Sequence, residues 1–407
     1  MKLSLFVVPY SSRDYFVWAI HNEEGNPVEN TADIKAPEKL NKELDLANDP
    51  FARLHWIDFL RFMYITVVVL YHVRMGLERA GIYDAGPTYL LVENFIGGFS
   101  MAGFFFVSGL FIVYSASRDL KVFLKAKFQT IVWLYLVWAV IHCITQAAMS
   151  QWTNRARSFS DIWTLIYMAP DHYWFLYTLF FSMLLFALAI RLRISMPVFL
   201  GICIAFHLTS FFPNIYLGDW GVVYSIRRYI MYTALGAVIG LDGKPFRWLI
   251  DTTARNLVLL GIAGSAFVFM CAYTGLRTDP RVIPFQAIFG LIGSSSWAIL
   301  LSRSGRFKFI EYIGRHSMYI YVAHVMGLAA MRIFLQKILG IEHALIHFVL
   351  GVAAAVYAPI LLAIVADKFG MYYLFSLRKP KVPGKTKTQE ELVGQPIKPQ
   401  TSEGQSS

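Results

Sequence analysis

The chain has 407 residues, of which 57% are hydrophobic and only 15% are charged, and its formal net charge is +11. A soluble protein of this length carries more charge, so the composition excludes an ordinary soluble domain and predicts an all-α, polytopic membrane protein. Most of the extra Lys and Arg residues lie between apolar segments, where membrane topology requires them, so the basic charge does not indicate a nucleic-acid partner.

Residues 1–52 form a polar arm before the first long apolar segment. Within it, residues 2–8 (KLSLFVV) and 14–20 (DYFVWAI) have the composition of short strands, and the HNEEGNP that follows is typical of a turn. We therefore expect a small hairpin that packs on the membrane domain. The apolar run before Pro9 is too short for the core of a signal peptide.

Residues 53–375 contain ten apolar segments and predict one membrane domain of about ten transmembrane helices. The segments are Leu54–Val73, Phe95–Tyr114, Phe128–Met149, Tyr173–Ile190, Ile194–Phe212, Val222–Leu241, Asn256–Tyr273, Val282–Leu301, Ile310–Leu335 and Ala344–Ala366. An even number of spans places both termini on the same side. The loops on that side carry more Lys and Arg than the opposite loops, so the termini are predicted to be cytoplasmic. Residues 376–407, rich in Pro, Gly, Lys, Gln and Ser, are predicted to form a disordered cytoplasmic tail.

The first span carries three ionisable residues, Asp58, Arg61 and His72, inside an apolar run. Such groups are costly in a membrane and usually face the protein interior. Eleven residues at ~100° each make about three turns plus ~20°, so Arg61 and His72 share a helix face, ~16 Å apart along its axis. Asp58 lies three residues before Arg61, on the same stripe. The stripe is either a functional site or a structural Asp58–Arg61 pair with an interfacial His72.

Further candidates follow along the chain, each with a structural alternative. Ser108 lies in the FFFVSG run of the second span, and the glycines of that span also suit close helix packing. Arg118, Lys125 and Lys127 form a basic strip that either binds phosphates or sets topology at anionic lipid. No CxxC motif or His/Cys cluster is present, so we expect neither a disulfide framework nor a metal site.

Trp174 lies in an aromatic segment that also fits an interfacial anchor. Arg227 and Arg228, at the start of the sixth span, either bind an anionic substrate or extend toward the membrane surface. His324, like His142 and His207, stands among apolar residues, where a histidine is usually a locally satisfied packing residue.

Four segments in order resemble landmarks of the membrane acyltransferase-3 family. Arg61 and His72, separated by ten intervening residues within LHWIDFLRFMYITVVVLYH, resemble its first-helix signature. FFFVSG at 104–109, HYWFLYTLF at 172–180 and IGRHSMYIYVAH at 313–324 resemble later ones. The resemblance covers residues 51–375 and implies transfer of an acyl group, from a donor such as acyl-CoA, to a hydroxyl of a carbohydrate or lipid at the opposite membrane face.

Many members of this family modify exported polysaccharides, lipopolysaccharide or periplasmic glucans, and this chain looks most similar to the glucan-modifying subgroup. The resemblance implies a bacterial inner-membrane protein that works with partner proteins of a polysaccharide or envelope pathway. We expect no bound cofactor, with acyl-CoA as a co-substrate.

For this reaction we expect His72 to act as the general base, because its ordinary pKa of ~6.5 suits proton transfer from a hydroxyl. A transient acyl-histidine is an alternative. Arg61, held by Asp58, would stabilise negative charge on the donor. The expected substrate contacts are Asp58, Ser108, Trp174, Arg227, Arg228 and His324, and the expected contacts to the nucleotide phosphates are Arg118, Lys125 and Lys127.

A transporter or flippase is the alternative of a different class. It would use Arg61 and His72 as a substrate or proton site without covalent chemistry. The sequence contains neither an internal repeat nor matching broken spans, both of which are frequent in transporters.

Overall fold

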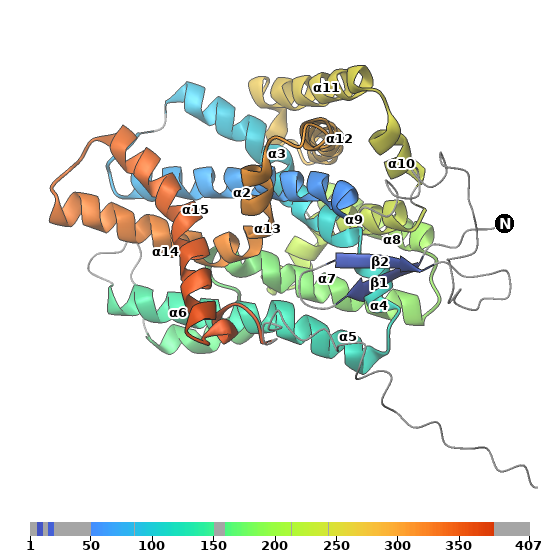
Figure 1. Ribbon diagram of the computed structural model, residues 1–407, viewed down its shortest axis with the longest axis horizontal. Coiled ribbons are helices and arrows are strands. Elements are labelled where there is room, and N and C mark those ends of the chain that lie inside the picture. The colour runs from blue at the N-terminus through green and yellow to red at the C-terminus, as the bar shows by residue number, and fades with distance from the viewer. Residues whose placement is uncertain are drawn as a thin grey trace, which may run out of the picture.

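The computed structural model describes residues 6–10, 15–19, 50–84, 86–149, 159–212, 214–242 and 244–377. The predicted C-terminal tail from residue 378 on, and most of the predicted polar arm, lie outside the described residues. Within the arm, strand β1 (Phe6–Tyr10) pairs antiparallel with β2 (Tyr15–Ala19), and Figure 1 places this hairpin near the start of the first long helix.

All ten predicted apolar segments are helical. The helices are α2 (Pro50–Arg79), α3 (Pro87–Gly109), α4 (Ile112–Ala116), α5 (Leu120–Lys127), α6 (Trp133–Ala148), α7 (Trp174–Arg191), α8 (Met196–Leu208), α9 (Gly221–Asp242), α10 (Lys244–Asp251), α11 (Ala254–Tyr273), α12 (Ile283–Ser302), α13 (Lys308–Arg315), α14 (Ser317–Ile333) and α15 (Ala344–Lys368). Shorter helical turns connect them, namely η1 (Phe128–Val132), η2 (Phe159–Ile166), η3 (Asp171–Tyr173), η4 (Thr209–Phe211), η5 (Leu276–Thr278), η6 (Phe334–Ile338) and η7 (Tyr372–Leu374).

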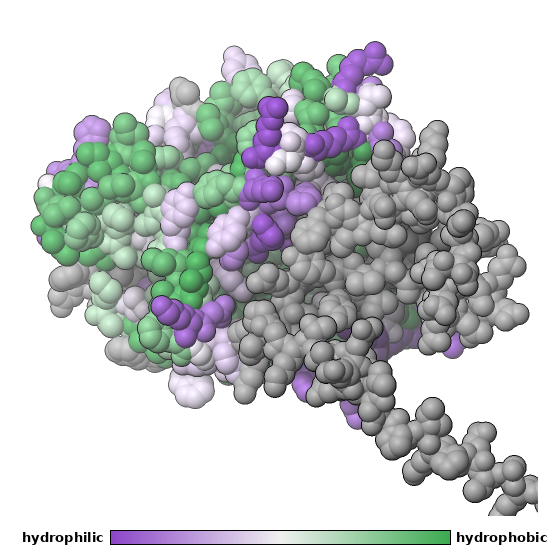
Figure 2. Space-filling model, viewed as in Figure 1, coloured by the Kyte–Doolittle hydropathy of each residue, from purple (hydrophilic) through white to green (hydrophobic). Residues whose placement is uncertain are grey.

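Eight helical segments among the described residues are long and apolar enough to cross a membrane. Of the other two predicted spans, Met196–Phe211 forms a shorter apolar helix, and α9 carries the charged pair Arg227 and Arg228. The prediction of an all-α, multi-pass membrane protein is therefore confirmed. Figure 2 shows a broad apolar surface over the ends of α14 and α15, whereas hydrophilic residues gather around α13.

Helix α2 is the centre of the bundle, since it packs against α3, α12, α13, α14 and α15 (Figure 1). Because α2 and α3 are joined by a short connection and pack side by side, the end of α2 lies beside the start of α3. The starts of α7, α9 and α12 lie at this same end of the bundle. The opposite end holds the start of α2 and the α4–α5 segment.

Local sequence explains several helix boundaries. Gly86-Pro87 begins α3, because proline has a helix-compatible φ and needs no backbone donor in the first turn. The Asp119 carboxylate accepts hydrogen bonds from the backbone N–H groups of Lys121 and Val122 and so caps the start of α5.

Candidate active site

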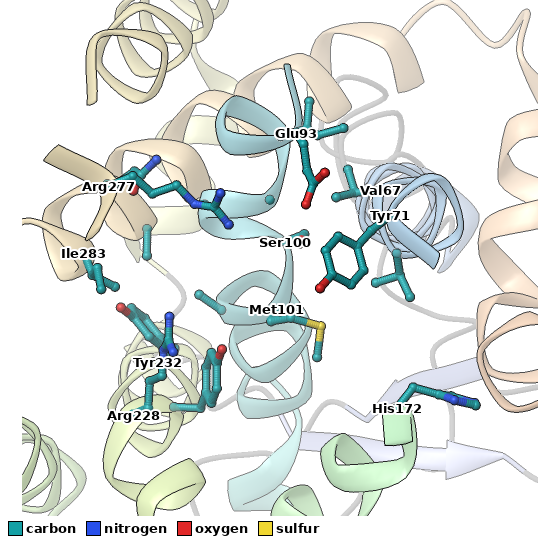
Figure 3. Close-up of a pocket in the computed structure, with 18 of the residues that line it drawn as sticks. Val67, Tyr71, Glu93, Ser100, Met101, His172, Arg228, Tyr232, Arg277 and Ile283 are labelled. Atoms are coloured by element: carbon teal, nitrogen blue, oxygen red, sulfur yellow. The ribbon is translucent and has the colours of Figure 1, made fainter. Parts of the chain in front are cut away.

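A cavity of ≈ 330 Å³ opens between α2, α3, α9 and α12, with the η3 turn and the start of α7 at one side (Figure 3). Its size is at the lower end of the range for small-molecule sites. Three charged residues line it, Glu93, Arg228 and Arg277, together with His72 and His172. The cavity therefore lies at the end of the bundle where α2 finishes and α3 begins.

His72 is half-buried at the cavity wall. Its Nδ1 lies 2.8 Å from the backbone oxygen of Val68, one helical turn earlier. A carbonyl oxygen can only accept, so this contact assigns the ring proton to Nδ1 and leaves Nε2 with its lone pair. In the neutral form of His72, the basic Nε2 is therefore the nitrogen that is available for proton transfer.

Three further imidazoles form a cluster with this ring. The ring centroid of His324 lies 4.8 Å from that of His72, and the centroid of His172 lies 5.7 Å from His72 and 4.9 Å from His324. His142 follows at 5.6 Å from His172. In the described part of the chain, no group of His, Cys, Asp or Glu side chains converges in a way that could hold a metal ion.

Two of these histidines keep buried polar atoms without a partner. His172 is 5% exposed, and neither of its ring nitrogens has a hydrogen bond to a described residue. His324 is fully buried; its Nδ1 lies 2.8 Å from the Tyr321 oxygen, and its Nε2 has no partner among the described residues. An unpaired buried polar group costs ~1–3 kcal/mol, so few are kept in a fold without a reason.

The η3 turn is fixed to α14 by reciprocal hydrogen bonds. The Tyr173 hydroxyl donates to the Val322 oxygen at 2.7 Å, and the Tyr321 hydroxyl donates to the His172 oxygen. Asp171 begins the turn at φ 43°, a left-handed conformation that aspartate tolerates better than most residues, and its Oδ2 lies 3.2 Å from Nε2 of His142. These contacts set the position of His172 relative to His324.

Asp58 and Arg61 lie at the other end of α2. Oδ1 of Asp58 is 3.4 Å from Nη1 of Arg61, and its Oδ2 is 3.9 Å from Nε of Arg315 at the end of α13. His55 pairs with Glu311 of α13 at 2.6 Å. The two ends of the predicted stripe thus face consecutive helices, because Asp58 pairs with Arg315 of α13 and the His72 ring contacts His324 of α14. Arg61 is 36% exposed and is not part of the cavity lining.

Trp174 and Arg228 join His72 at the cavity. The Trp174 ring stacks on Tyr229 at 5.3 Å, and the Arg228 guanidinium lies 5.5 Å from the same ring. Arg227 points elsewhere, because its guanidinium lies over the ring of Tyr224 at 5.0 Å and it is not part of the lining.

The remaining predicted site residues lie away from the cavity. The Ser108 hydroxyl donates to the Phe104 oxygen at 2.8 Å within α3. Arg118 precedes α5, and Lys125 and Lys127 lie within it, at the end of the bundle where α2 begins (Figure 1). The Lys127 ammonium lies 5.5 Å from the Phe123 ring. The structure therefore brings His72, Trp174 and Arg228 to the cavity and leaves the basic strip at the opposite end. His324 is not part of the lining and lies behind it, against the His72 ring.

Sequence reasoning missed four residues of this region: His142, His172, Arg277 and Gln286. A polar amide inside the apolar run IPFQAIFGL was a usable signal for Gln286, because polar groups within a span usually have a function. Arg277 lies in a short connection between two spans, where a cation is ordinary. For His172 the signal was its place between Asp171 and an aromatic run.

Comparison with known families identifies the family to which the chain belongs. A family model described as an acyltransferase domain, acyltransferase-3, matches residues 54–364. The chain belongs to the acyltransferase-3 family. No curated protein and no solved structure matches it.

The protein is therefore a multi-pass membrane acyltransferase that requires an acyl donor and an acceptor. The transporter interpretation loses its basis, because Arg61 and His72 belong to a domain of known enzymatic class. The matched segment runs from α2 into α15 and contains every residue that lines the cavity of this acyltransferase.

Proposed function

We propose that this acyltransferase moves an acyl group from acyl-CoA to a hydroxyl of a carbohydrate, with His72 as the general base. The acceptor would belong to an exported polysaccharide, a glucan or lipopolysaccharide, and the enzyme would lie in a bacterial inner membrane with both termini in the cytoplasm. The observation that carries the proposal is the His72 ring at the cavity wall, with Nδ1 bound to the Val68 oxygen and Nε2 left as a base.

The reaction balances with His72 alone as the proton carrier. Nε2 takes the proton of the acceptor hydroxyl while that oxygen attacks the thioester carbonyl. The tetrahedral intermediate then collapses, the C–S bond breaks, and the imidazolium returns the proton to the leaving thiolate. The Val68 contact supports this cycle, because it fixes the ring orientation and stabilises the Nδ1–H form throughout.

The neighbouring imidazoles supply the polar surroundings that the reaction needs. The unpaired nitrogens of His172 and His324 offer hydrogen bonds that a polar substrate would satisfy. A preorganised donor in a water-poor site stabilises developing charge more strongly than a donor in water. We assign the donor role at the intermediate to His172, which lines the cavity. Nδ1 of His324 donates to the Tyr321 oxygen, so its Nε2 can only accept, and we assign it to the proton of a hydroxyl.

The acceptor side of the cavity has features that suit a sugar. Trp174 and Tyr229 stack with their ring planes inclined by 30° and present apolar faces with polar edges. A sugar has the same division between C–H faces and hydroxyl edges. We therefore place the acceptor against Trp174, with its reacting hydroxyl toward His72.

The donor would approach from the opposite end of the bundle. Arg118, Lys125 and Lys127 lie there and would contact the nucleotide phosphates of acyl-CoA. Arg61 lies ~16 Å from His72 along α2, too far to act on the same carbonyl oxygen. We assign it to donor binding, supported by its partial exposure and its pairing with Asp58.

The test compares wild type with His72→Gln in cells, by mass spectrometry of extracted glycans and envelope lipids. His316→Gln is the matched control, because Nδ1 of His316 makes the same contact, at 2.7 Å, to the oxygen four residues earlier, on a ring that is not part of the cavity lining. We expect an ester that disappears in His72→Gln and persists in His316→Gln, at equal membrane levels. An ester pattern that is unchanged in His72→Gln would refute the role of His72.

A further inference from the structure

The side of the cavity that faces away from the histidines carries charge that nothing in the proposed reaction uses. Figure 3 shows Arg228, Tyr232 and Arg277 gathered on this side, with Tyr71 and His172 on the other. These residues come from α9 and from the η5 turn between α11 and α12, so the fold brings together two cations that are distant in sequence.

Both arginines lack an ion-pair partner among the described residues. In the described part of the chain, neither Arg228 nor Arg277 has a carboxylate within ion-pair distance. A guanidinium nitrogen of Arg277 donates instead to the neutral side-chain oxygen of Asn94. Burial lowers the pKa of Arg277, and the positive charge of Arg228 lowers it further, whereas the negative charge of Glu93 raises it. The Arg277 side chain remains a cation, because an arginine is not deprotonated in proteins.

The one carboxylate of the lining is already occupied. Glu93 pairs with Arg74, whose Nη2 donates to Oε1 at 3.2 Å and whose Nε lies 2.8 Å from Oε2. Arg74 is 8% exposed and also pairs with Glu78. Glu93 thus shares Arg74 with Glu78 and makes no ion pair with either lining arginine.

Two buried polar side chains at the same place also lack partners. Gln286 is 1% exposed, and neither its amide nitrogen nor its amide oxygen has a hydrogen bond to a described residue. The Tyr232 hydroxyl, on a side chain that is 2% exposed, has none either. Both line the cavity. Buried donors without acceptors, beside two cations without anions, form a site that is complete only when a ligand supplies oxygen atoms.

We propose that Arg228, Arg277, Gln286 and Tyr232 form a subsite for an oxyanion of the substrate, a carboxylate or a phosphate, across the cavity from His72. This proposal rests on the proposed acyl transfer and names the substrate class. The enzyme then selects a reactant that carries an anion, either as the free carboxylate of a dicarboxylic acyl group or as a carboxylate or phosphate on the acceptor. Guanidinium groups suit this task because their planar donors match both anions.

The first test uses the purified full-length protein in lipid nanodiscs, with inorganic phosphate and malonate as probes and malonamide as the neutral counterpart of malonate. Thermal unfolding reports binding, since a ligand of the folded state raises the midpoint with concentration. We expect either anion to raise the midpoint of wild type and malonamide to have no effect. Arg228→Gln and Arg277→Gln should lose the shift, and Arg277→Lys should keep part of it.

Arg281→Gln is the matched control. Arg281 follows η5, pairs with Asp279 and is 75% exposed, so its loss removes the same charge outside the cavity. Arg228 is itself exposed, so Arg228→Gln keeps the proposal testable even where Arg277→Gln fails to fold. A shift that survives both cavity substitutions, or that disappears equally in Arg281→Gln, would overturn the subsite.

The second test identifies the source of the anion from the ester made in cells. A product whose acyl group ends in a free carboxylate places the anion on the donor. A neutral ester on an acceptor that carries carboxylate or phosphate places it on the acceptor. In either case we expect Arg277→Gln to lower product formation roughly tenfold to a hundredfold at equal protein level, as expected for lost charge-assisted hydrogen bonds.

A neutral acyl group on a neutral acceptor would overturn the subsite and leave the proposed function standing. If wild type and His72→Gln carry the same esters, the proposed function fails, while the malonate and phosphate measurements still decide the subsite by themselves.

Discussion

Gly109→Ala tests the contact that holds two walls of the cavity in place. Gly109 ends α3 against the backbone of α9, and a Cβ there would lie 2.9 Å from the carbonyl carbon of Thr233 and closer still to its oxygen. Carbon atoms pack at about 3.5–4.0 Å, so the two helices must separate by roughly 1 Å. The obstacle is backbone, which cannot rotate away as a side chain can.

The expected cost follows from overpacking, which typically destabilises by about 1–3 kcal/mol; a backbone clash belongs at the upper end, about 2–3 kcal/mol. Activity should fall more than stability. Residues of both α3 and α9 line the cavity, and a displacement of ~1 Å in an active site can reduce the rate by about 100-fold.

The assay is equilibrium unfolding of the purified variants in mixed micelles, together with ester yield in cells. Gly201→Ala is the control, because a Cβ at Gly201 in α8 would meet nothing within 4 Å. That variant should be neutral or gain up to ~1 kcal/mol from helix propensity. If Gly109→Ala unfolds with the same free energy as Gly201→Ala, the close α3–α9 contact does not exist and the cavity described between them is wrong.

Two further substitutions separate binding from positioning. Arg61→Ala should raise KM for acyl-CoA roughly tenfold, while the free energy of unfolding stays within ~1 kcal/mol of wild type, because an exposed ion pair contributes little. Steady-state kinetics with unchanged KM and a lower stability would instead assign Arg61 to the contact with α13. Tyr173→Phe removes the hydrogen bond to Val322 and should cost ~1 kcal/mol and lower kcat, because the η3 turn no longer holds His172. Tyr135→Phe, which loses a hydroxyl bond to Leu165 of η2, should show the same stability loss with unchanged kcat.

Sequence alone predicted the helices well, because the length and hydropathy of a span are properties of one continuous segment. It also predicted that Asp58 and His72 share a face of α2, since that follows from helical geometry within one element. The helix ends moved: α2 continues to Arg79, and α3 stops at Gly109, where its backbone packs on α9.

The histidine cluster could not be predicted in the same way. His72, His172 and His324 come from three distant segments, and the periodicity of each helix says nothing about which neighbour its polar face meets. His324 looked like a packing residue because its own helix is apolar around it. Only the reciprocal tyrosine bonds between η3 and α14 explain why His172 lies beside it.

Sequence alone also could not predict which of the two neighbouring arginines of α9, Arg227 or Arg228, faces the cavity. Neighbouring positions on a helix are ~100° apart, so only one of them faces a given cavity. Which one depends on how α9 is rotated, and its packing against α3 through small residues sets that rotation. The structure selects Arg228 and turns Arg227 toward Tyr224.

The distribution of charge over the bundle then separates two kinds of cation. At the start of α2, Asp58 pairs with Arg61 of the same helix and with Arg315 of α13, so both cations have a carboxylate and the Arg315 pair helps to hold α2 against α13. At the cavity, Arg228 and Arg277 have no such carboxylate among the described residues, and the fold bears the cost of keeping them close to each other. Structural pairing accounts for the first pair and leaves the second unexplained. Selection of the substrate by charge therefore belongs to the cavity end, on the same small volume that His72 faces.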